Sequence, residues 1–131
     1  MDGSDVTRWF GEYLAAFAAC GRGERDCRSL LAYYGVPLLI TTSEGVFSLT
    51  SDAEVVAAVQ PQIDGMRAAR YARTELLDGA VTVVNASSAL YRGTFSWRGS
   101  AGGEIRRFTA TYLVTDGAEG RRISVLAVHA P

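Results

Sequence analysis

The sequence has no lysine, one histidine and two cysteines, and each scarcity excludes a class of site. A structural zinc ion needs four nitrogen or sulfur ligands, which Cys20, Cys27 and the distant His129 do not provide, so we expect no metal and no cofactor. The net charge of −1 offers no clustered positive field to displace the counterions of a nucleic acid. We therefore expect no nucleic-acid partner.

Long apolar runs are also missing, since no stretch approaches the roughly 20 residues that span a bilayer. The first residues are acidic and lack the basic start and apolar run of a secretory signal. From these features we expect a cytoplasmic protein with no membrane partner. All of the basic residues are arginine and alanine is abundant, which is typical of a GC-rich bacterial genome.

What is present fits one ordinary globular domain covering residues 1–131. Independent domains commonly contain about 50 to 200 residues, so a chain of 131 residues holds one comfortably. The hydrophobic share of 48% and the charged share of 21% are those of a protein that folds around a core.

Apolar residues with helical spacing predict a first helix that ends near Gly21, with Ser4 or Asp5 as its N-cap. The stripe consists of Val6, Trp9, Phe10, Tyr13, Leu14 and Phe17. A second, shorter helix is predicted from Asp26, with Gly35 and then Pro37 stopping it.

A third helix is predicted from the S-x-x-E spacing of Ser51 and Glu54. In such a capping box, the two side chains satisfy each other's free backbone N–H groups. Pro61 should kink or restart this helix, because proline lacks the N–H group that a helix interior uses.

Strand-like patterns surround the third helix and fill the rest of the chain. Two short runs, 38–42 and 46–49, precede it, and four longer strands follow at 73–84, 88–98, 104–115 and 121–129. Asp78-Gly79 fits either a bulge in one long strand or a further hairpin. Glycines inside long strands, Gly79 and Gly93, favour a bent sheet.

Three helices before a long antiparallel meander predict an α+β domain whose helices cover one face of a strongly curved sheet. In the strand 88–98, the side carrying Tyr91, Phe95 and Trp97 should face the helices. The last strand is mostly apolar on both faces, as is the Phe108 to Val114 side of its neighbour. Because apolar groups on an outer sheet face are usually covered, we expect a homodimer through that face.

The order of elements resembles the nuclear-transport-factor-two-like superfamily, especially its SnoaL-like and ketosteroid-isomerase-like branch. Local similarities are Trp9-Phe10 with Tyr13-Leu14, the segment 30–34, and the final hairpin segment 116–124. The resemblance covers nearly the whole chain. It implies a cone-shaped α+β barrel whose mouth often holds a small apolar molecule, and frequent dimerisation through the sheet.

The isomerase mechanism of that branch needs a carboxylate base and an oxyanion hole formed by a tyrosine and a protonated aspartic acid. Tyr13 resembles the oxyanion tyrosine by position. The base position falls on Thr41 or Thr42 and the acid on about Thr111, and threonine is no general base at neutral pH. Catalytic residues are therefore not identified, and Glu44 and His129 are better interpreted as a solvated turn residue and a strand-terminal surface group.

Aromatic and hydroxyl side chains are the candidates to line the cone. These are Trp9, Tyr13, Phe17, Tyr34, Thr41, Tyr91, Phe95, Trp97, Thr109 and Thr111. They favour non-catalytic binding of a small hydrophobic molecule by a dimeric protein. The alternative is an isomerase- or cyclase-type enzyme acting on a hydrophobic carbonyl compound, and a sealed cone would leave a dimerisation module.

Overall fold

Helix α1, Gly3–Gly21, presses the predicted apolar stripe onto the sheet in the computed structural model, which describes residues 1–131. Asp2 caps the helix, rather than Ser4 or Asp5, and its carboxylate accepts hydrogen bonds from the backbone N–H groups of both. Val6 and Phe10 in its first half and Cys20 near its end are fully buried, so α1 is anchored along its length rather than at one end.

The second helical segment, η1 at Cys27–Ala32, is a short 3-10 helix with Asp26 as its N-cap, the predicted start. Helix α2, Asp52–Ala68, begins at the predicted Ser51 cap, whose hydroxyl accepts from the Glu54 N–H. The Glu54 carboxylate reaches back to the N–H of Thr50 rather than that of Ser51. Pro61 lies inside one uninterrupted helix, so the helix does not restart there.

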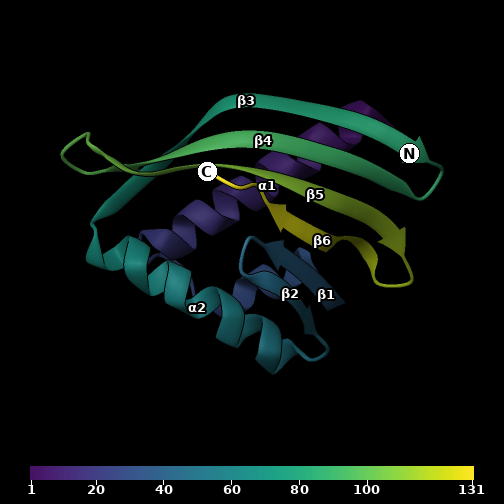
Figure 1. Ribbon diagram of the computed structural model, residues 1–131, viewed down its shortest axis with the longest axis horizontal. Helices are drawn as coiled ribbons and strands as arrows, with labels where there is room; N and C mark the ends of the chain where they lie inside the picture. The colour runs from purple at the N-terminus through teal and green to yellow at the C-terminus, as the bar shows by residue number, and fades with distance from the viewer.

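Six strands form one curved sheet (Figure 1). They are β1 Tyr34–Thr42, β2 Gly45–Leu49, β3 Tyr71–Asn85, β4 Ser88–Gly99, β5 Glu104–Gly117 and β6 Gly120–Val128. Their order is β2-β1-β6-β5-β4-β3, so β2 and β3 are edges and the sheet does not close into a barrel. The pairs are antiparallel except β1 with β6, which run parallel. The predicted α+β class is confirmed.

Strand β1 begins at Tyr34 rather than at Leu38. Gly35 and Pro37 therefore lie inside the strand and not before it. The register of β1 against β6 is irregular between Tyr34 and Leu39. Pro37 therefore falls where the two strands do not pair regularly and where its missing N–H is not needed.

Strand β3 settles the Asp78-Gly79 ambiguity in favour of a bulge, because its register against β4 shifts between Leu76 and Asp78. Gly79 lies opposite Gly93 in the next strand. A Cβ atom on Gly79 would stand 2.6 Å from the Tyr91 hydroxyl, and one on Gly93 would stand 2.5 Å from the Phe95 ring. Both glycines thus give aromatic side chains room to lie flat on the sheet.

The predicted inner side of β4 does face the helices, and Tyr91, Phe95 and Trp97 are buried there. The Phe108 to Val114 side of β5 also faces inward, because Phe108 pairs with Phe95 and Val114 with Ala89. That side therefore does not contribute to the outer face. The apolar residues that do lie opposite one another across the outer face are Leu90, Leu113, Val125 and Leu39.

The helices lie on the inner side of the sheet at different places. Figure 1 shows α1 crossing behind the strands and α2 below the long strands, to the left of β1 and β2. None of the helices combines the length and the apolar character that crossing a bilayer requires.

Candidate functional site

A cavity of about 640 Å³ lies between the inner sheet face, the two long helices and the turn between β1 and β2. Of its 26 lining residues, 15 are hydrophobic, which is typical of a site for an apolar molecule. The aromatic members are Tyr13, Phe17, Tyr34, Phe95, Trp97, Phe108 and Tyr112. Helix α2 contributes only Ala58, Val59 and Gln62 to the wall.

The other half of the inner face is filled by α1. The Phe10 ring stacks on Tyr91 with centroids 3.8 Å apart and meets the Tyr112 ring edge-on at 4.7 Å. Beyond it, Val6 packs with Ala89 and Val114 in a small buried cluster. The cavity therefore begins beyond Phe10, and Tyr13, Leu14 and Phe17 of α1 form part of its wall.

Two tyrosine hydroxyls form the buried polar centre of the cavity wall. The oxygens of Tyr13 and Tyr34 are 2.6 Å apart, and each side chain is almost completely buried. Burial, above all other causes, raises the pKa of both hydroxyls well above the usual value for tyrosine, so both stay protonated. The pair holds two hydroxyl hydrogens and uses one between the rings, which leaves one for an acceptor atom.

The third buried phenol, Tyr112, lies beside this pair, with its ring centroid 6.2 Å from that of Tyr13. Burial also raises its pKa well above the usual value. None of the three phenols is therefore a base near neutral pH. The site is a cluster of neutral hydrogen-bond donors in aromatic surroundings.

The cavity mouth carries the charged and polar groups. The Arg106 guanidinium lies over the Phe108 ring at 4.6 Å and near the Trp97 ring at 5.5 Å, so a cation covers the aromatic wall. His129 also contributes to the lining, but its imidazole turns to the outer face, where Nε2 lies 2.7 Å from the Thr111 hydroxyl. Glu44, in the β1–β2 turn, is the only carboxylate side chain among the lining residues.

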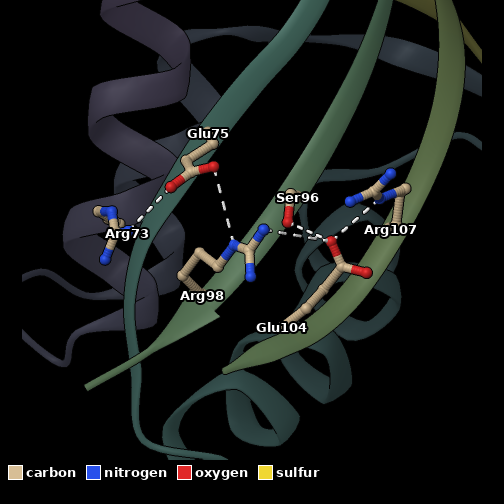
Figure 2. Close-up of polar contacts among 6 residues, drawn as sticks. All are labelled: Arg73, Glu75, Ser96, Arg98, Glu104 and Arg107. Carbon is tan, nitrogen blue, oxygen red and sulfur yellow. Dashed lines mark hydrogen bonds and ion pairs between the residues drawn. The ribbon is translucent and has the colours of Figure 1, made fainter. Parts of the chain in front are cut away.

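A second polar cluster lies on the outer face of β3, β4 and β5 (Figure 2). The Glu104 carboxylate accepts hydrogen bonds from the Ser96 hydroxyl at 2.5 Å and from the Arg107 Nε at 3.0 Å. These two bonds, in that order of effect, lower the pKa of Glu104. Arg98 lies between Glu104 and Glu75, at 3.9 and 3.7 Å, and so links β4 to both neighbouring strands.

This outer cluster holds charges in place but encloses no cavity. Arg73 completes it through an ion pair of 2.8 Å with Glu75. No group of three or more histidine, cysteine, aspartate or glutamate side chains in the chain is arranged to hold a metal ion. The cavity on the inner face is therefore the candidate site.

Six of the ten predicted lining residues contact the cavity: Tyr13, Phe17, Tyr34, Phe95, Trp97 and Thr109. Whether they bind a ligand stays a prediction. Trp9 does not contact it, because its ring packs beside Tyr33 at 5.7 Å and against the buried cluster of Val6, Ala89 and Val114. Tyr91 does not contact it either, because it lies under Phe10 in the filled half.

Thr41 and Thr111 lie on the outer face and are not among the residues that line the cavity. Thr41 stands between Ile40 and Thr42, both of which line the cavity, and strand alternation turns it outward. Thr111 is the outward neighbour of the buried Ala110 and Tyr112. A shift of one residue along a strand exchanges the two faces of the sheet, so the neighbours of each threonine face inward.

Arg106 and Tyr112 are lining residues that sequence reasoning missed. The signal was in the hairpin between β4 and β5, whose register places Arg106 opposite Trp97 and Tyr112 opposite Tyr91. This pairing places both residues on the same side of the sheet as Trp97 and Tyr91.

Comparison with known proteins agrees with this architecture. The model of the family described as NTF2-like protein (DUF6841) matches residues 4–131. The chain belongs to this family. The match confirms the predicted superfamily, while the SnoaL-like or ketosteroid-isomerase-like branch stays a prediction. No curated protein matches the sequence.

Among solved structures, a cystatin-like-fold domain of unknown function from Nostoc punctiforme aligns with a TM-score of 0.71 and 23% identity, covering 98% of this chain and 77% of that one. An NTF2-like protein from Cytophaga hutchinsonii aligns over 100% of both chains with a TM-score of 0.66 and 13% identity.

A putative calcium/calmodulin-dependent protein kinase II association domain from Xanthomonas campestris has a TM-score of 0.68 and 15% identity, covering 97% of this chain and 86% of that one. At such identities, these likenesses show that the proteins share this NTF2-like fold.

Proposed function

We propose that this NTF2-like protein binds a small hydrophobic molecule, without catalysis, in the cavity on the inner face of its sheet. The observation that carries the proposal is the cavity of about 640 Å³ with a mostly hydrophobic lining and a protonated tyrosine pair. Apolar walls supply the affinity, and a hydroxyl donor orients an acceptor atom of the guest.

The ionisable groups support binding rather than proton transfer from carbon. A general base must be within hydrogen-bond reach of the proton that it takes and have a pKa near the working pH. The buried phenols have raised pKa values and stay protonated. Glu44 is the only carboxylate side chain at the cavity and lies exposed in a turn at its mouth.

Titration with N-phenyl-1-naphthylamine, a neutral dye that fluoresces in apolar surroundings, tests the proposal. We expect saturable binding and energy transfer from Trp97, which lines the cavity. Ala58→Trp should lower the affinity about tenfold or more, because the indole would fill the cavity beside α2.

Ala57→Trp is the matched control, since Ala57 is exposed on the same helix and does not line the cavity. It should bind the dye as the parent protein does. Absence of saturable binding to the parent protein, or equal binding by both variants, would contradict the proposal. Circular dichroism establishes that both variants are folded.

The tyrosine pair also favours a second candidate, an isomerase- or cyclase-type enzyme acting on a hydrophobic carbonyl compound. Neutral phenols in apolar surroundings can stabilise an oxyanion as it forms. Incubation with a β,γ-unsaturated ketone, followed by the ultraviolet absorbance of the conjugated product, tests this candidate. Turnover that Tyr13→Phe lowers and Glu44→Gln abolishes would support the enzyme, and no turnover above the buffer rate would reject it for this substrate class.

We also propose that the protein is a homodimer through the outer face of its sheet. The supporting feature is the apolar row formed by Leu90, Leu113, Val125 and Leu39 on four adjacent strands. The similar Xanthomonas protein is described as an association domain, which fits a role of this fold in assembly.

Light scattering at micromolar concentration should give twice the chain mass of 14.0 kDa. Leu90→Arg should yield a monomer, because it buries a charge in the proposed interface. Leu77→Arg, at an exposed site on the edge strand β3, should leave the dimer intact. A monomeric parent protein would contradict the proposal.

A further inference from the structure

Two adjacent arginines of β5 lie on opposite faces of the sheet and differ in their partners. The Arg107 Nε donates to the Glu104 carboxylate at 3.0 Å, within the outer cluster of Figure 2. Arg106 forms no ion pair and no side-chain hydrogen bond; its guanidinium instead covers the Phe108 and Trp97 rings. The positive charge at the cavity mouth is therefore free to meet an anion.

The arrangement of Arg106 suits a carboxylate better than a compact anion. A guanidinium is planar, and packing over aromatic rings leaves the N–H donors at its edges free. Those donors match the two oxygens of a carboxylate, which they bind in a bidentate manner. A single free arginine next to aromatic rings is thus suited to an acid whose carboxylate is attached to an apolar body.

Aromatic contacts lead from this mouth to the buried tyrosine pair. Trp97 contacts Phe17 with ring centroids 6.2 Å apart, Phe17 contacts Tyr13 at 6.0 Å, and Tyr13 contacts Tyr34 at 5.6 Å. A ligand with ring systems could lie along this wall and reach the free hydroxyl hydrogen with its far end. The cavity therefore has an anion-binding end and a neutral, donor end.

We propose that the ligand of the cavity is a hydrophobic carboxylic acid and that Arg106 determines this specificity. The inference rests on the proposed binding function and names its ligand class. Glu44, the one carboxylate side chain at the mouth, is exposed in a turn, where solvent and salt screen its repulsion. Arg107 does not duplicate the role, because Glu104 already neutralises it.

The test compares two probes of nearly the same shape, naphthalene-1-acetic acid and naphthalene-1-acetamide, as competitors of N-phenyl-1-naphthylamine at neutral pH. The acid should bind about fivefold more tightly than the amide, as expected of a partly exposed, charge-assisted contact. Arg106→Gln should remove this preference and leave the affinity for the amide within about twofold.

Arg92→Gln is the matched control, because Arg92 is an exposed arginine without an ion pair on the outer face of β4. It should keep the preference for the acid. Equal affinity for both competitors, or a preference that survives Arg106→Gln, would overturn this inference while binding of the neutral dye still stood. Failure of the neutral dye to bind would overturn the proposed function and this inference with it.

Discussion

The two halves of the inner sheet face are built from the same strands and the same kinds of residue, yet one is core and the other is cavity. In the filled half, Phe10 of α1 stacks on Tyr91 at 3.8 Å. In the open half, Phe95 and Trp97 continue the same side of β4, but Phe17 of α1 stands 6.2 Å from Trp97, and α2 offers only Ala58, Val59 and Gln62 to the cavity.

The difference lies in the helices and not in the strands. Phe10 of α1 stacks closely on Tyr91, whereas Phe17 of α1 stands 6.2 Å from Trp97 and α2 adds only short side chains, so the cavity stays open between these elements. The position of the cavity in this protein is therefore set by where the helix side chains do not fill the space above the sheet. Substitutions in the filled half should therefore mainly lower the free energy of unfolding, and substitutions in the open half should mainly change ligand affinity.

The largest expected effect is a difference in unfolding free energy between an alanine substitution in the filled half and one in the open half. Phe10→Ala should lower the free energy of unfolding by about 3–5 kcal/mol, because it leaves a cavity in packed core. Phe17→Ala, on the cavity wall, should cost roughly half as much, because Phe17 is only partly buried and its removal enlarges an existing space. Urea denaturation measures both, and equal costs would break the comparison.

The buried phenols should make the protein sensitive to alkali. Burial raises the pKa of Tyr13, Tyr34 and Tyr112 in the folded state above the unfolded value of 10.0. The contribution of the three neutral phenols to the free energy of unfolding is fully present below pH 10. Above that pH the unfolded chain ionises, and the free energy of unfolding falls by about 1.4 kcal/mol per pH unit for each phenol.

Urea denaturation between neutral pH and alkaline pH, followed with absorbance at 295 nm, checks this prediction. These phenols should ionise only as the protein unfolds. Three phenolate signals appearing in the folded state would show that the region around the pair is open to water.

The hydroxyl pair should behave as one unit. Tyr34→Phe leaves the Tyr13 hydroxyl without its partner and should cost about 1–3 kcal/mol of unfolding free energy. The double variant Tyr13→Phe/Tyr34→Phe should cost less than the sum of the two single changes, because it removes both polar groups. Additive single effects, measured in urea, would mean that the two hydroxyls are not coupled.

The smallest effect is expected in the outer cluster. The pKa of Glu104 is lowered in the folded state. Its contribution to the free energy of unfolding is therefore present above the unfolded pKa and is lost as the pH falls through the folded-state pKa. Glu104→Gln should therefore flatten the acid side of the stability profile and leave dye binding unchanged. A loss of dye binding would show that the two faces are coupled through β5.

Local patterns in the sequence predicted most elements because each pattern has a local cause. The capping serine Ser51 and the glycine-rich turns fixed helix and strand limits within a few residues. The parallel pairing of β1 with β6 was not predicted, because it joins segments far apart in the chain. Nothing in the local sequence around Pro37 reveals that β1 continues through it as an irregular strand.

The site was harder to predict than the fold for a related reason. Alternation along β4 identified Phe95 and Trp97 as inward residues, but the same pattern could not separate them from Tyr91. That separation depends on Phe10 of α1, which stacks on Tyr91 and fills the space above it. The faces of Thr41 and Thr111 depend on cross-strand register, which single strands do not specify.

The most direct test of the claim that the open half is a binding cavity is a crystal structure of the protein with N-phenyl-1-naphthylamine. We predict that the dye lies against Trp97 and Phe17, with the face of one aromatic ring toward the hydroxyls of Tyr13 and Tyr34. A structure in which the side chains of the open half close on one another, with the dye absent or bound elsewhere, would contradict the account.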